Sequence, residues 1–282
     1  MIACGEMKHN NIIRNKNAIA GVIEALLLVA IVSIVLSTIQ LVYIPQIMEQ
    51  KEAEHMDLIS NQFSTLKSYI ELQAITESSA PISTMITLGS REIPYFITAK
   101  SYGEIFTIVD SSFNIETLPA SPNFPSGIPL TSIEYRAYNS YFVDQDYVLE
   151  GGALIIQQES GESVMRVDPS IYVETEPQIN IDFDLPIIVD TPGKNSTHGF
   201  GKCFVRTNWS QGETDYIPNI NSLTIYTQYP TAWEESLYDL IGDDVSYEKG
   251  DSYVKITKTG KNINLNLNYY YVYVQIGYGW IK

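Results

Sequence analysis

The chain has 282 residues, and its 33 Asp and Glu outnumber its 17 Lys and Arg, which gives a formal net charge of −16. All of this excess follows residue 45, because the residues up to that point carry a small net positive charge. A polyanionic surface repels nucleic acid and anionic lipid headgroups, so we expect no nucleic-acid partner. The sequence holds only two Cys and three His, and it lacks the phosphate-loop, serine-hydrolase and zinc-peptidase motifs. These features favour a protein without catalytic activity, cofactor or metal.

Residues 18–44 form an apolar run, AIAGVIEALLLVAIVSIVLSTIQLVYI, in which Glu24 is the single acidic or basic residue. About 20 apolar residues suffice for a helix to cross a bilayer, so the run predicts a transmembrane helix with the lipid bilayer as partner. A cleaved secretory signal is the main alternative, but its apolar region is typically about half as long.

The flanks of this run predict its orientation. Residues 1–17 are a basic leader, whereas acidic residues follow the run. Because basic flanks stay in the cytoplasm, we expect a single-pass protein of the cell membrane. Its N-terminus would be cytoplasmic and its C-terminal region extracellular.

Residues 45–80 predict a helical stalk, because they hold neither Gly nor a second Pro after Pro45. Pro45 is expected to kink the helix, and Ser78, Ser79 and Pro81 are expected to end it. Apolar side chains spaced three and four residues apart form a narrow seam on one helix face. The seam consists of Met56, Ile59, Phe63, Leu66 and Ile70. It packs either on the protein's own outer region or against neighbouring copies in an assembly.

From residue 81 on, apolar and polar residues alternate between turn residues, which predicts short β-strands. A Gly- and Pro-containing segment at 191–201 predicts two β-rich subdomains, 81–190 and 191–282. The predicted fold class is therefore α+β. A long N-terminal helix would lead into an antiparallel, sandwich-like β region with one short helix.

Two local motifs stand out within the β-rich region. Gly151-Gly152 predicts a tight turn between two strands. A helix is predicted over 231–241, with Thr231 as N-cap, Glu234 completing a capping box and Gly242 ending the helix.

The first 80 residues resemble the N-terminal region of archaeal type IV pilin-like surface proteins. The resemblance lies in a basic leader (HNNIIRNK), an apolar helix with an early Glu (AGVIEALLLVAIVSIV), a continuing helix and a β-rich outer region. In that family a peptidase removes the leader and the mature helices bundle as a filament core. The resemblance implies that Glu24 pairs with the N-terminus of a neighbour, a copy of the chain or another pilin-like subunit. From the residues alone, Glu24 is either an interfacial acid without a partner or a helix-bundle contact.

Other candidate sites lie in the predicted extracellular region. Asn195 and Asn208 begin N-x-S/T sequons, which predict a glycoprotein. Paired Asp residues at 144 and 146, 182 and 184, and 243 and 244 lack the spacing of a calcium loop and favour a solvated surface. The many Tyr residues could stack on sugars, but Tyr in strands is more often half-buried.

The sequence therefore predicts a membrane-anchored, outward-facing surface protein of pilin-like build that acts by self-association or adhesion. Glu24 and the seam would be the assembly residues. The alternative is a monomeric anchored protein whose β-rich region binds an extracellular ligand or contacts the surface layer.

Overall fold

The computed structural model describes residues 13–90, 101–109, 111–121, 123–124, 130–158 and 161–279, with side chains from Ala20 on. The chain divides into two compact units, Met1–Glu49 and Gln50–Lys282. Most of the predicted leader lies outside the described residues.

The described part of the first unit, from Ile13 on, is helical. Helix α1 spans Ile13–Thr38, a π-helical segment spans Ile39–Tyr43, and helix α2 follows over Ile44–Ile75. The described side chains of α1 are all exposed, and the helix from Ala20 on is long and apolar enough to cross a membrane.

The helix departs from α geometry directly before Pro45, where the sequence predicted a kink. The Ile44 N–H donates to the Ile39 carbonyl, which is the longer bond of a π-helical turn. Proline has no N–H for the usual acceptor four residues earlier, so a widened turn beside it costs little.

Helix α2 ends at Ile75, a few residues earlier than the sequence predicted. The chain leaves it through a Schellman arrangement, in which the Glu77 N–H donates to the Ala74 carbonyl and the Ser78 N–H donates to the Gln73 carbonyl. Glu77 has a φ of 47°, in the left-handed region. The helix thus ends by satisfying its own last carbonyls, before Pro81 can interrupt it.

Replacing Glu77 with Gly is expected to raise the free energy of unfolding by about 0.5–1 kcal/mol, because Gly adopts the left-handed conformation without a steric cost. Chemical denaturation of the full chain measures this. The control is Glu54→Gly at an exposed position inside α2, which should lower stability by about 1 kcal/mol. A loss of stability in both variants would contradict the assigned helix end.

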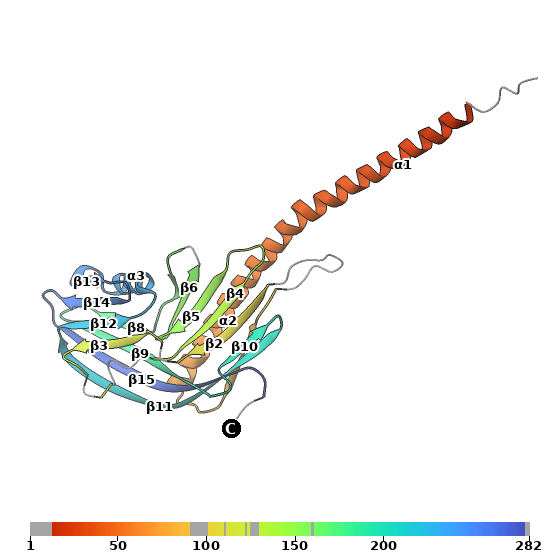
Figure 1. Cartoon of the computed structure of the whole chain (residues 1–282). Coiled ribbons are helices and arrows are strands. Elements are labelled where there is room, and N and C mark those ends of the chain that lie inside the picture. The colour runs from red at the N-terminus through yellow and green to blue at the C-terminus, as the bar shows by residue number, and fades with distance from the viewer. Residues whose placement is uncertain are drawn as a thin grey trace, which may run out of the picture. The chain divides into compact units, whose positions relative to one another are not determined.

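Among the described residues, the second unit holds three β-sheets (Figure 1). The five-stranded sheet has the order β1 (Ile82–Thr87), β11 (Lys202–Ile220), β15 (Ile263–Ile276), β9 (Ile179–Asp190) and β8 (Ile171–Glu174). The six-stranded sheet has the order β10 (Ser196–Gly199), β2 (Tyr102–Ile108), β4 (Ser132–Tyr138), β5 (Gln145–Glu150), β6 (Ala153–Gln158) and β7 (Val164–Val167). The four-stranded sheet has the order β13 (Val245–Lys249), β14 (Tyr253–Lys258), β12 (Ser222–Tyr226) and β3 (Asn114–Leu118).

The pairing of β9 with β15 overturns two predictions. These strands run parallel over their length, so the region is not antiparallel throughout. Their pairing also joins the two predicted subdomains, as do the pairs β1–β11, β2–β10 and β3–β12. The break near residue 191 is a loop between β9 and β10, and the residues on both sides share one compact unit.

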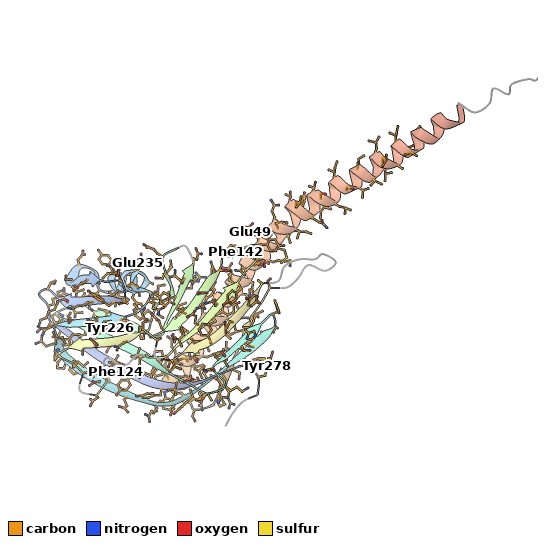
Figure 2. All side chains as sticks on the ribbon, viewed as in Figure 1. Glu49, Phe124, Phe142, Tyr226, Glu235 and Tyr278 are labelled. Atoms are coloured by element: carbon orange, nitrogen blue, oxygen red, sulfur yellow. The ribbon has the colours of Figure 1, made fainter. Side chains whose placement is uncertain are left out.

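From Gln50 on, α2 lies in the core of this unit, so the prediction of a separate stalk is wrong there. The seam packs against both the five-stranded and the six-stranded sheet, with Val272 and Ile133 among its neighbours. Its members are at most 2% exposed: Met56, Ile59, Phe63, Leu66 and Ile70. The seam cannot contact neighbouring copies, because packing inside the chain already covers it. Side chains fill the space between α2 and the sheets (Figure 2).

A second core lies on the opposite face of the five-stranded sheet. Strand β15 buries Leu265 and Leu267 in this second core, but further along it buries Val272 and Val274 beside α2. Side chains alternate between faces of a strand, so these two pairs point in opposite directions. The sheet therefore changes its buried face along its length, which leaves the other face near Leu265 and Leu267 open to polar residues.

Helix α3 spans Pro230–Ile241 and ends at Gly242, as the sequence predicted. Its predicted capping box is wrong. Tyr229 is the N-cap without a side-chain bond, and Glu234 pairs with Lys249 at 2.6 Å. Pro230 explains the shift, because a proline at the first helical position has no N–H that needs a cap.

The tight turn at Gly151-Gly152 is confirmed between β5 and β6, with φ of 56° and 80°. Beside it, Glu150 is buried and accepts hydrogen bonds from Thr227 Oγ1 at 2.5 Å and Trp233 Nε1 at 2.8 Å. Burial raises the pKa of Glu150 from 4.5 to about 7.

This raised pKa predicts that stability falls as pH rises from about 4.5 to 7. The folded state binds the Glu150 proton more tightly than the unfolded state does, so the contribution is complete below pH 4.5 and is lost through pH 7. Glu150→Gln is expected to flatten this slope and to raise stability at pH 8 by roughly 1–3 kcal/mol. Thermal unfolding at a series of pH values measures the effect, with exposed Glu174→Gln as control. An unchanged slope in Glu150→Gln would contradict the assignment.

Candidate functional site

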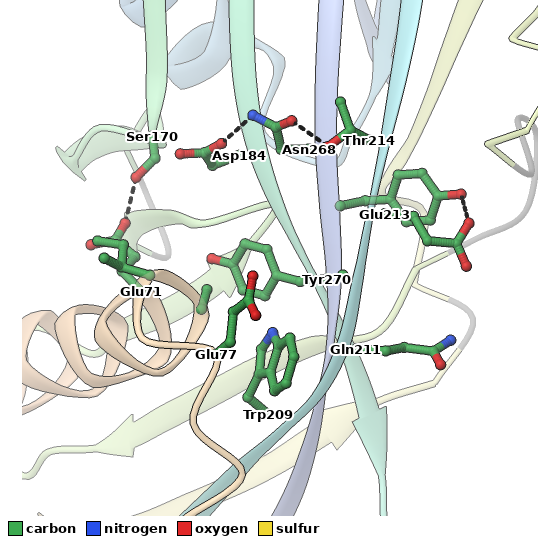
Figure 3. A pocket seen from close by; sticks show the side chains of 14 residues that line it. Glu71, Glu77, Ser170, Asp184, Trp209, Gln211, Glu213, Thr214, Asn268 and Tyr270 are labelled. Atoms are coloured by element: carbon green, nitrogen blue, oxygen red, sulfur yellow. Dashed lines mark hydrogen bonds between the residues drawn. The ribbon is translucent and has the colours of Figure 1, made fainter.

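A pocket lies within the second unit, between the C-terminal end of α2 and strands β9, β11 and β15 (Figure 3). Its volume is about 520 Å³, and small-molecule sites typically measure about 300–1,000 Å³. The lining combines aromatic rings with carboxylates and amides. It includes Glu71, Glu77, Ser170, Asp184, Trp209, Gln211, Glu213, Thr214, Asn268, Tyr269 and Tyr270.

Four carboxylates line the pocket, and three of them accept a hydrogen bond from a neighbouring side chain. The pairs are Ser170 Oγ to Glu71 at 2.6 Å, Asn268 Nδ2 to Asp184 at 2.8 Å and the Tyr269 hydroxyl to Glu213 at 2.7 Å. Glu71 is also paired with Lys67. An ionised carboxylate offers about four lone-pair positions, so each of these groups can accept further bonds.

Two side chains bring hydrogen-bond donors to the same pocket. Tyr270 is only 7% exposed, and its hydroxyl has no hydrogen-bond partner among the described residues. Burial and the charges of Glu71 and Asp184 raise the pKa of Tyr270 well above its ordinary value, which keeps the hydroxyl protonated. The half-buried Trp209 indole N–H also lacks a partner within the described part of the chain. Both rings stand beside the Glu77 carboxylate in Figure 3.

A ladder of polar side chains continues from the pocket along β9 and β15. Parallel pairing sets each amide of β15 beside its partner on β9. The bonds are Asn264 Nδ2 to Asn180 Oδ1 at 2.9 Å, Asn266 Nδ2 to Asp182 Oδ1 at 2.8 Å and Asn268 Nδ2 to Asp184 Oδ1 at 2.8 Å. The Thr214 hydroxyl extends the last pair to β11, where it donates to Asn268 Oδ1 at 2.9 Å. The amides thus hold one oxygen of each Asp and leave the other oxygen available.

Exposed aromatic rings stand at both ends of one rung of this ladder. Tyr172 on β8 lies opposite Asp182, and Tyr216 on β11 lies opposite Asn266. Directly paired residues point to the same face of a sheet. The two tyrosines are 60% and 59% exposed. We call this surface, together with the pocket, the polar–aromatic face.

The pocket carries a strongly negative local field. Among the described residues, neither Lys, Arg nor His lines it, and Lys67 alone offsets the charge of Glu71 from outside the lining. Low-dielectric walls strengthen such a field. The pocket therefore disfavours phosphate, sulfate and carboxylate ligands.

The predicted assembly residue Glu24 is exposed on α1, within the first unit. The seam is buried in the second unit, so the two parts of the predicted assembly set belong to different units.

The two sequons lie in different settings. Asn195 directly precedes the edge strand β10 and is half-buried, and its carbonyl accepts the Thr107 N–H at 2.8 Å. Asn208 lies inside β11, opposite Tyr273 of β15. Glycosylation stays a prediction at both positions.

The other two Asp pairs also have protein partners. Asp144 accepts the Asn139 N–H at 2.6 Å, and Asp244 pairs with Lys261 at 3.2 Å. The described residues hold no group of three or more His, Cys, Asp or Glu side chains arranged to bind a metal ion.

Comparison with protein-family models, with curated proteins and with solved structures finds no match for this chain. The candidate site is therefore assigned from its own geometry.

Asp182 and Asp184 stand out in the sequence as one of three Asp pairs, but nothing in that pair predicts a pocket. The available signal was a pair of alternating polar runs, N-x-D-x-D at 180–184 and N-x-N-x-N at 264–268. Their parallel pairing could not be inferred, because strand order is not encoded in either run.

Proposed function

We propose that this chain is a membrane-anchored protein that presents its β-rich region outside the cytoplasm and acts by attachment rather than catalysis. The observation that carries the proposal is helix α1, whose described side chains are all exposed and predominantly apolar. An exposed apolar surface of this length is unfavourable in water, and the hydrocarbon core of a bilayer would bury it. The basic residues before the apolar run, Lys8, Arg14 and Lys16, favour a cytoplasmic N-terminus and therefore an outward-facing C-terminal region.

A compact second unit with a lined pocket supports attachment as its role. Its α2 seam is covered within the chain, so this unit does not depend on neighbouring copies to bury that seam. The buried seam therefore favours a monomeric binding protein over an assembly held together by the seam.

Alkaline carbonate washing of membranes from cells that express the full chain tests the anchor. We expect the chain to stay in the membrane pellet. Leu27→Arg combined with Ile31→Arg should release it, because each buried charge costs about 2.5–3.5 kcal/mol on insertion scales. The control is Leu72→Arg at a half-exposed site on α2, which should remain in the pellet. Release of the unmodified chain by the wash would contradict the proposal.

Self-association through α1 is the second candidate, and the observation that favours it is the position of Glu24 within the apolar helix. A carboxylate there gains from pairing with a basic group on a neighbouring helix. N-terminal sequencing from native membranes should then find a terminus between Ala18 and Gly21. Cross-linking between copies should also fall in Glu24→Gln. This candidate would be contradicted if the native N-terminus is uncut and if Glu24→Gln cross-links as strongly as the unmodified chain.

A further inference from the structure

We propose that the polar–aromatic face of the five-stranded sheet binds neutral saccharides. This inference rests on the proposed attachment function and names the class of ligand that would serve it. The face consists of the pocket under α2 and the adjoining rung from Tyr172 to Tyr216.

Charge excludes anionic ligands. Four carboxylates line the pocket, and none of its described lining residues carries a positive charge. A phosphate, a sulfate or a uronic acid would meet repulsion there. A neutral or cationic ligand remains.

Hydrogen-bond chemistry favours the neutral ligand. Tyr270 is more than nine-tenths buried, its hydroxyl has no partner among the described residues, and the Trp209 N–H also lacks one. Both can donate to an acceptor in the pocket, whereas an ammonium group or a metal ion offers no acceptor. A sugar hydroxyl both donates and accepts. It can donate to Glu77 or Asp184 and accept from Tyr270 and Trp209.

Aromatic placement favours a saccharide over other neutral polar ligands. The C–H face of a pyranose ring is apolar and packs on aromatic rings, while its hydroxyls lie at the rim. Tyr172 and Tyr216 stand at the two ends of a rung whose middle is the Asp182–Asn266 pair. The two tyrosines lie on the outer two of four adjacent strands, so three spacings of about 4.8 Å set them roughly 14 Å apart. A chain of several sugar rings would span both tyrosines.

Preorganisation supports binding at this face. The amide ladder holds Asp182 and Asp184 in fixed positions through Asn266 and Asn268. Groups held in this way lose little rotamer freedom when a ligand binds. The two carboxylates can thus accept hydrogen bonds from sugar hydroxyls without a change of their side-chain conformation.

Saturation-transfer NMR on the full chain in lipid nanodiscs tests the proposal. The probes are neutral tetrasaccharides built from glucose, mannose, galactose or N-acetylglucosamine, with a tetrauronate and tetramethylammonium chloride as comparison ligands. We expect at least one neutral tetrasaccharide to bind and the tetrauronate not to bind. Binding of no neutral saccharide at about 10 mM would overturn the proposal. Binding of tetramethylammonium alone would also overturn it.

Matched variants locate the site. Tyr270→Phe removes only the hydroxyl and should weaken binding by about threefold to tenfold. Tyr172→Ala combined with Tyr216→Ala should weaken it by about tenfold or more. The control is Tyr238→Ala, an exposed tyrosine on α3 away from the face, which should bind normally. Unfolding curves confirm that each variant is folded, and unchanged binding in both folded face variants would overturn the proposal.

The carbonate wash separates this proposal from the anchor. If the chain stays in the membrane but binds no saccharide, the saccharide site is wrong and the anchor stands. If the chain is washed out but still binds a saccharide through Tyr270, the anchor is wrong and the site stands.

Discussion

Glu52→Ala is expected to lower the free energy of unfolding of the second unit by about 2–4 kcal/mol. Glu52 is fully buried on α2, and its carboxylate accepts backbone N–H groups of three successive residues, Ser140, Tyr141 and Phe142. The shortest of these bonds measure 2.7 Å. Removing the carboxylate leaves these donors without an acceptor and frees the connection between β4 and β5 from α2.

The measurement is chemical denaturation of the full chain, followed by tryptophan fluorescence. Glu54→Ala is the matched control, because Glu54 lies on the same helix but is exposed. This control should change stability by less than about 0.5 kcal/mol. Equal effects of the two variants would show that the Glu52 carboxylate does not hold the loop.

Gly151→Ala is expected to lower stability by about 3–5 kcal/mol through two causes. Gly151 has a φ of 56°, where a side chain costs about 1–2 kcal/mol. A Cβ at this position would also lie 2.2 Å from Cζ of Phe113. Phe113 stacks on the buried Trp233 with ring centroids 5.5 Å apart, so it has little room to move.

Gly193→Ala separates these two causes. Gly193 has a φ of 76°, but a Cβ there would meet nothing within 4 Å. It should therefore show the backbone cost alone, about 1–2 kcal/mol. Thermal unfolding measures the loss of stability in both variants, and the difference between the two losses is the cost of the clash with Phe113. A Gly151 variant no less stable than the Gly193 variant would contradict the packing of Phe113 against the turn.

Local features of the fold could be predicted from the sequence where one residue type has one strong conformational preference. The Gly151-Gly152 turn and the stop at Gly242 are such cases, and both are confirmed. Thr231 failed as an N-cap because Pro230 competes for the same helix start. Two local rules gave different answers, and the sequence alone does not rank them.

Long-range arrangement could not be predicted from the same signals. The seam on α2 indicates an apolar face, but its spacing is the same whether sheets of its own chain or other copies cover it. The parallel pairing of β9 with β15 also depends on strand order, which alternating patterns do not contain. The candidate site depends on both features, so its residues appeared in the sequence only as separate polar runs.

The most direct test of the account is the side of the membrane on which the β-rich region lies. Asp251→Cys places a thiol at an exposed position, in a chain with Cys4→Ser. The native Cys203 is buried and serves as an internal control that should stay unlabelled in the folded chain. A membrane-impermeant maleimide is added to intact cells and, in parallel, to lysed cells. If the β-rich region lies outside the cytoplasm, position 251 is labelled equally in both samples, and labelling only after lysis would contradict that placement.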